Sequence, residues 1–298
     1  MPIQFKEIGR RLRAHRLGRN LSADEIADRI GVSRAAVYRL EKGELVKIQT
    51  LGAVSELLDV SLPSLLGVAV EYYSNAIAFF ERMRQLEENV VHVLGNFSPI
   101  SFLLLSDEYM DHIKTMLLES IPDSHENRAK ETLYIGKVLE ILKERRAAAA
   151  KRKIPILSLV GAQDIERFLR FGLIGRFDLP DSVHRERRAA ARREVERFVD
   201  IIIRQPIGIQ VGVVDGMPPT QTFQIFERTD ESAVTLSPYR LGDQPNISAG
   251  IALVTSAPEA LRLFQDMLAR QWESAHKGSS GAEILKRILV RTREDHAS

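Results

Sequence analysis

Residue types and spacings that could carry out catalysis are sparse in this chain of 298 residues. There is no cysteine, which excludes disulfides, cysteine-ligated metals and a thiol nucleophile. The seven histidines show neither HExxH nor another paired-ligand spacing, so we predict no metal site. No glycine-rich loop carries GxGxxG or GxxxxGKS/T, and nucleotide binding therefore has no support in the sequence. We expect no cofactor.

The string nearest to a catalytic motif is His112, Lys114 and Glu119. Enzymes of the phospholipase D superfamily use the motif HxKxxxxD, in which the histidine is the nucleophile and the lysine holds the phosphate. Here a glutamate stands at the aspartate position, the surrounding stretch has a helical pattern, and there is no second copy. We interpret the match as a coincidence and predict that the protein is not an enzyme.

Basic residues are concentrated near the N-terminus. Residues 1–50 hold 11 Lys and Arg against 6 Asp and Glu, although the net charge of the whole chain is only +2. This asymmetry favours a polyanionic partner for the N-terminal part alone. The first residues are basic, and no window holds about 18 uninterrupted apolar residues. We therefore expect no signal peptide, no membrane partner and a cytoplasmic location.

The spacing of apolar residues in this basic part predicts a bundle of short helices. Ser22 and Glu25 form a capping box that opens a short helix, Gly31 supplies the turn after it, and Ser33 can cap the next helix. Two short helices around a glycine turn make a helix-turn-helix, whose second helix can enter the major groove of DNA. Besides the helix opened by Ser22, the pattern predicts helices at residues 5–16, 34–42, 48–58 and 62–66.

The segment LSADEIADRIGVSRAAVYRLEKGE resembles the XRE family of regulators, the group of phage lambda repressor and Cro. The resemblance covers about residues 6–67 and implies an all-α, lambda-repressor-like domain that binds a double-stranded DNA operator. The residues that stand where the family places them are Ala27, Gly31, Val32, Ser33, Val37, Glu41 and Gly43.

The resemblance also implies roles for single residues. Arg34, Ala35 and Tyr38 would face base edges, with Arg39 outward or flanking. Arg34 is the strongest candidate, because a guanidinium can bond guanine O6 and N7 together. Phosphate contacts position a protein on DNA without reading its sequence. The residues that the resemblance places for such contacts are Ser33, Lys42 and Lys47.

One position departs from the family, and one role is structural. Many members carry a glutamine that holds phosphate where this chain has Ala23, so one anchoring contact is in doubt. Glu41 is expected to pair with an arginine of the first helix, such as Arg13, as in relatives.

A connector helix is predicted over residues 68–88. Its apolar residues alternate gaps of four and three, which makes just over two heptads. Such a seam belongs either to a dimer-forming helix or to a connector lying on its own domain. A helix-turn-helix of this size usually needs a second half-site, which favours a homodimer. The seam residues are Tyr72, Ala76, Phe79, Met83 and Leu86.

Residues 89–277 are predicted to form an α/β domain with a mixed sheet. Asp215-Gly216 followed by Pro218-Pro219 is a turn signal. It predicts that the strands at 207–216 and 222–227 are antiparallel neighbours. GSSG at 278–281 is interpreted as a hinge that opens a C-terminal segment, 278–298, with a short helix. The predicted strands are at 90–95, 154–161, 207–216, 222–227, 232–237 and 250–256, and the predicted helices at 105–120, 130–151, 162–171, 188–204 and 258–275.

The last part of this domain loosely resembles the closing hairpin, strand and helix of phospholipase D-like domains that serve as sensors in some bacterial and archaeal regulators. The resemblance rests on element order and implies an effector-binding domain without catalysis. Ligands in mixed sheets bind where strand ends diverge. The two arginines and the tyrosine at such places would suit an anionic or aromatic effector. The alternative is that both arginines pair with surface acids. The candidate effector-binding residues are His184, Arg228, Tyr239, Arg240 and Thr255.

Together these features predict a multi-domain, one-component bacterial transcription regulator. It would bind operator DNA as a homodimer, and an unknown small-molecule effector in the C-terminal domain would alter that binding. Whether it is a repressor or an activator stays open. Two alternatives also stay open: a phosphodiesterase-like C-terminal enzyme with an autoregulatory helix-turn-helix, and an antitoxin-like module that binds a protein partner.

Overall fold

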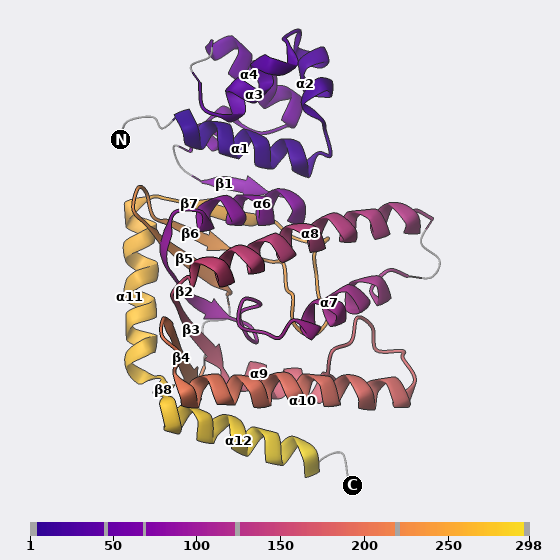
Figure 1. Ribbon diagram of the computed structural model, residues 1–298, viewed down its shortest axis with the longest axis vertical. Helices are drawn as coiled ribbons and strands as arrows, with labels where there is room; N and C mark the ends of the chain where they lie inside the picture. The colour runs from indigo at the N-terminus through magenta and orange to yellow at the C-terminus, as the bar shows by residue number, and fades with distance from the viewer. Residues whose placement is uncertain (1–4, 45–46, 68–69, 123–125, 218–220, 295–298) are drawn as a thin grey trace.

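The computed structural model describes residues 5–44, 47–67, 70–122, 126–217 and 221–294. The described chain has an N-terminal helical domain and an α/β region built on one mixed sheet, as the sequence predicts. In Figure 1 the helical domain lies at one end of the molecule, and the sheet below it is seen with its strands stacked from β1 to β8. No helix in the described ranges is long and apolar enough to cross a membrane.

The helical domain has its own apolar core. Ile26 and Val37 are fully buried in it, one from each helix of the predicted motif. The capping box is confirmed: Ser22 N donates to Glu25 Oε2 at 2.7 Å, and Glu25 N donates to Ser22 Oγ at 3.1 Å. Gly31 ends the first motif helix with a φ of 68°, which glycine adopts without strain. The helices are α1 (Phe5–Gly18), α2 (Ala23–Ile30), α3 (Arg34–Glu41), α4 (Ile48–Leu58) and α5 (Leu62–Leu66).

The predicted connector begins as a strand, β1 (Glu71–Tyr73), and continues as the helix α6 (Ala76–Glu87). Tyr72 lies on the strand and is 57% exposed. The other four seam residues are at most 1% exposed, because α6 packs them into the core of its own domain. Of the two interpretations that the sequence leaves open, the structure therefore favours the connector, since this seam is not available to a second chain.

The strand order of the sheet is β1-β7-β6-β5-β2-β3-β4-β8. The pairs β2–β3 and β3–β4 are parallel, and the other neighbours are antiparallel. The strands at both edges, β1 and β8, were not predicted, because each has at most three residues. The remaining strands are β2 (Val90–Phe97), β3 (Ile156–Gly161), β4 (Ile209–Val214), β5 (Phe223–Arg228), β6 (Ala233–Leu236) and β7 (Ala252–Thr255).

The antiparallel pair predicted from Asp215-Gly216 is wrong. β4 pairs with β3 and β8, whereas β5 pairs with β2 and β6. The turn signal is local and marks where β4 ends, but β2 and β3 lie between the two strands that it was expected to join. Residues 218–219 of the same signal lie outside the described residues.

Helices cover the two faces of the sheet unequally. In the described chain, residues of α6, α7, α8, α9, α10 and α12 form the core on one face, whereas α11 packs against the other face (Figure 1). Trp272 on α11 is partly buried and packs on the second face beside Gly212. The helices are α7 (Glu108–Glu119), α8 (Arg128–Arg152), α9 (Ala162–Phe171), α10 (Asp181–Arg204), α11 (Pro258–Ser274) and α12 (Gly278–Glu294).

The hinge predicted at residues 278–281 is also wrong, because these residues form the first turn of α12. Gly278 has a φ of 52°, which lets the chain turn directly from β8 into the helix. The helix is held in place by its apolar side, where Leu285 is fully buried against α9 and α10. Packing thus decides the structure of a segment whose composition alone indicates flexibility.

Candidate nucleic-acid interface

Helix α3 has one buried side and one exposed side. Val37 and Leu40 are 0% and 3% exposed and face the core of the helical domain. The four residues predicted to face or flank DNA bases are all exposed, so the structure leaves them accessible to a groove. They are Arg34, Ala35, Tyr38 and Arg39.

The guanidinium of Arg34 is held in place at the start of α3. It donates to the Tyr38 hydroxyl at 3.3 Å, lies 5.5 Å from the centre of the Tyr38 ring, and pairs with Asp24 of α2 at 3.4 Å. The hydrogen bond to Tyr38, followed by the charge of Asp24, raises the pKa of Arg34. These contacts orient the group, and its side chain stays 61% exposed and open to a base edge.

The three residues predicted to contact phosphate are exposed around the same helix. Ser33 caps α3, with its Oγ accepting from Ala36 N at 3.2 Å, so its hydroxyl proton remains available to a phosphate oxygen. Lys42 ends α3 and Lys47 precedes α4. The N-terminus of α4 has no side-chain cap, and its free N–H groups favour an anion beside Lys47.

Ala23 and Glu41 are the positions at which the resemblance implies a doubtful phosphate contact and a structural ion pair. Ala23 is only 4% exposed, so this position offers no substitute for the family's glutamine. Glu41 does pair with helix α1, but its partner is Arg16, whose Nε donates to Glu41 Oε1 at 2.5 Å. The example named from the resemblance, Arg13, is wrong, because it lies nearly one turn earlier and approaches Glu81 of α6 at 3.8 Å instead.

Helix α1 joins the helical domain to the α/β domain through buried charges that were not predicted from the sequence. Glu7 pairs with Arg82 at 3.0 Å and with Arg228 at 3.3 Å. Arg11 pairs with Glu71 at 2.5 Å, and Arg82 also reaches Glu71 at 2.9 Å. No local signal could reveal these pairs, since Glu7 and Arg228 are 221 residues apart in sequence.

The charges in this interface hold one another in the ionised form. Burial by itself would raise the pKa of Glu71, but Arg82 and Arg11 outweigh it and bring the value to about 2. Burial likewise opposes ionisation of Glu7, whose pKa is nevertheless lowered by Arg82 and Arg228. Breaking one partner out of such a buried network leaves an uncompensated charge, so the two domains are joined in one preferred orientation.

The predicted effector residues do not line one cavity. Arg228 is 9% exposed and is bound to Glu7 and Asp230. His184 binds the Phe177 carbonyl through Nε2 at 3.0 Å, and Thr255 Oγ1 accepts from Ala257 N at 3.1 Å.

Tyr239 and Arg240 are the exception, because both line one cavity beside the end of β2. Its volume is about 50 Å³, far below the roughly 300–1,000 Å³ of ordinary ligand pockets. The Tyr239 hydroxyl donates to the Tyr73 carbonyl at 3.3 Å, which ties this residue to β1.

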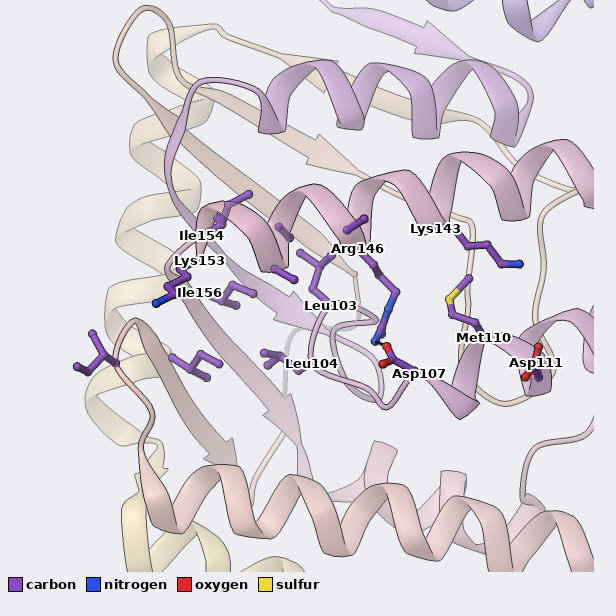
Figure 2. A pocket seen from close by; sticks show the side chains of 15 residues that line it. Leu103, Leu104, Asp107, Met110, Asp111, Lys143, Arg146, Lys153, Ile154 and Ile156 are labelled. Carbon is purple, nitrogen blue, oxygen red and sulfur yellow. Dashed lines mark hydrogen bonds and ion pairs between the residues drawn. The ribbon is translucent and has the colours of Figure 1, made fainter.

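A larger cavity of about 560 Å³ lies between α7, α8 and the starts of β3 and β4. Figure 2 shows Lys153, Ile154 and Ile156 at one end and Lys143 with Asp111 at the other. Arg146 lies between them and pairs with Asp107 at 2.8 Å. This cavity could not be predicted from the sequence, because its walls come from separate segments between Leu103 and Ile209.

Comparison with known proteins identifies the N-terminal domain. Residues 12–65 match a protein-family model described as helix-turn-helix. No curated protein matches the chain. These comparisons give no support to the phospholipase D-like resemblance of the C-terminal region. The matched range holds all of α2, α3 and α4, so both helices of the predicted motif and the turn at Gly31 lie within it.

Proposed function

We propose that the protein is a one-component transcription regulator that reads double-stranded DNA with α3 and responds to a small molecule bound by its α/β domain. The observation that carries the proposal is the division of α3 into two sides. Its apolar residues are committed to the core, and Arg34 is exposed in a fixed position with Ser33 and Lys47 around it. This is the arrangement that a major-groove reader requires.

Regulation of DNA affinity by the α/β domain is the second part of the proposal. An effector can act only if it binds DNA-competent and DNA-incompetent states with different affinity. The buried charges between α1 and the sheet domain supply a route, because any shift of Glu71 or Arg82 changes the environment of α1. α1 in turn packs against α3.

A homodimer completes the proposal, since one helix-turn-helix contacts a single half-site. The seam of α6 and the apolar side of α12 are both used within the chain, so the contact between two copies uses a different surface.

The proposal is tested by selecting DNA that the full chain retains from a randomised duplex library. A regulator of this type selects a short sequence repeated with two-fold symmetry, and footprinting protects both halves. Recovery of unenriched sequences would show that the full chain does not recognise a specific DNA sequence under these conditions. A selected site without a repeat would contradict the proposed homodimer but would still support sequence-specific DNA binding.

A further inference from the structure

The large cavity of the α/β domain has an apolar floor with no occupant among the described side chains. Ile154 and Ile156 lie at one end, and Ile209 is the register partner of Ile156 on β4. Ile207, just before β4, also lines this end and is fully exposed to solvent. Ile154 and Ile156 are 7% and 5% exposed, so Ile207 is the residue whose apolar side chain lies in water. An apolar ligand in the cavity would cover it, which is favourable.

Helix α8 keeps the cavity open because it presents alanines to it. Ala147, Ala149 and Ala150 line the wall, and a larger side chain at any of them would enter the space. The volume of about 560 Å³ lies within the roughly 300–1,000 Å³ typical of small-molecule sites. The floor and the alanine wall together form a site for a compact apolar group.

The charges at the rim are distributed unequally. Arg146 and Asp107 neutralise each other near the middle. Asp111 lies at the same end as Lys143, whereas no carboxylate lines the isoleucine end with Lys153 (Figure 2). Among the described residues, the Lys153 ammonium has no ion-pair or hydrogen-bond partner. An anion is therefore favoured beside Lys153 and disfavoured at the opposite end.

We propose that this cavity binds a small amphipathic carboxylate, with its apolar body on the isoleucine floor and its anionic group at Lys153. The proposal rests on the regulatory function proposed above, because it identifies the chemical class of the effector and its site. It places the effector away from Arg228 and Arg240, and on the helix that reaches the DNA-binding domain.

Helix α8 connects the cavity to α1 at two points. Arg152, adjacent to Lys153, donates through Nη1 to the carbonyls of Glu87 and Glu88 at 2.5 and 2.6 Å. Glu88 then pairs with Arg10 of α1 at 2.6 Å. Further along α8, Lys137 donates to Asn20, just after α1. A ligand that moves the C-terminal end of α8 thus acts on the DNA-binding domain through these contacts.

The binding half of the proposal is tested by calorimetric titration of the full chain with sodium decanoate and with decan-1-ol. We expect one decanoate per chain, tighter binding than for the neutral alcohol, and about fourfold weaker binding for each methylene removed. Decyltrimethylammonium should bind more weakly than either. Equal affinity for all three head groups, or no saturable binding of decanoate, would overturn the proposal.

Variants locate the site. Ala150→Trp fills the cavity and should abolish binding, and Ala269→Trp on the exposed surface of α11 is the matched control. Ile207→Ser, at a fully exposed position, should weaken both decanoate and decanol without affecting folding. Lys153→Asn should lower decanoate affinity about three- to fivefold and remove the preference over decanol, whereas Lys143→Gln should not. Unchanged binding by Ala150→Trp, or loss of the preference in Lys143→Gln alone, would contradict the assignment.

The regulatory half is tested with the DNA selected above, by measuring its affinity with and without decanoate. A change in DNA affinity that decanoate causes in the parent protein but not in Ala150→Trp supports the route through α8. Decanoate that binds in the cavity but leaves DNA affinity unchanged would overturn this half and leave the binding site. Failure of the chain to bind DNA both with and without decanoate would concern the helix-turn-helix alone and would not alter the titration result.

Discussion

The imidazole ring of His15 on α1 lies parallel to the phenol ring of Tyr73 on β1, with the ring centres 4.6 Å apart and an angle of 7° between the planes. His15 is 7% exposed, and its Nε2 has no hydrogen-bond partner in the structure. Burial lowers the pKa of His15 to about 4, with Glu71 acting in the opposite sense and Arg82 in the same sense. The contact between the domains thus requires a neutral histidine.

Stability should therefore depend on pH through His15. Between about pH 6.5 and 4 the unfolded chain binds a proton at this residue and the folded chain does not, so the free energy of unfolding falls as pH falls. The stabilising contribution is complete above pH 6.5, and about 2 kcal/mol of it is lost between pH 7 and pH 5. His15→Phe keeps the ring stack and should remove this loss. Urea denaturation at both pH values measures it, and identical pH dependence in parent and variant would refute the assignment.

Arg82→Met should strongly destabilise the protein. The Arg82 side chain is 2% exposed and pairs with both Glu7 and Glu71, so the substitution removes one buried cationic partner from each of these two buried carboxylates. We expect a loss of about 3–5 kcal/mol in the free energy of unfolding, measured by urea denaturation at pH 7. The control is Arg262→Met on α11, where an exposed pair with Asp266 is removed and the change should stay within about 0.5 kcal/mol. Similar losses in the free energy of unfolding of the two variants would show that the buried network stabilises the protein no more than an exposed ion pair does.

Arg34→Ala should reduce affinity for the selected operator by about 1–3 kcal/mol and relax the preference at one base pair, because it would remove the bidentate contact to guanine that we expect for this guanidinium. Binding is measured by fluorescence anisotropy on the operator and on a scrambled duplex. Equal weakening on both duplexes would instead assign Arg34 to a phosphate.

Lys47→Ala should weaken binding to operator and scrambled DNA by the same factor, because we expect its exposed ammonium beside α4 to contact the DNA backbone. The slope of log affinity against log salt concentration should fall by about 1, as expected for one lost phosphate contact. A slope equal to that of the parent would remove Lys47 from the interface.

Local signals predict the DNA-binding domain well, because its defining interactions connect residues close in sequence. The capping box joins Ser22 to Glu25, and the glycine turn needs only Gly31. The exposure of Arg34 follows from the burial of Val37 and Leu40 on the same helix. The candidate base-reading surface was therefore predictable residue by residue.

The α/β domain is predicted in its elements but not in its connections. The seam of α6 has the same spacing whether it packs on its own sheet or on a second chain, so only the structure separates the two. The Asp215-Gly216 signal marks a turn but cannot reveal that β2 and β3 lie between β4 and β5. The cavity is hidden for the same reason, since Leu103, Ala150 and Ile209 meet only after the sheet has formed.

The charged interface at α1 also has a consequence for operator architecture. A reader on a flexible tether can rotate to meet half-sites at several spacings. Here α1 packs against α3 and also carries Glu7, which pairs with Arg82, so α3 keeps one orientation relative to the sheet. In a dimer, the distance and angle between the two readers are then set by the α/β bodies. One base pair inserted between half-sites rotates one of them by about 35°, and such a spacer should be rejected even when both half-sites are intact.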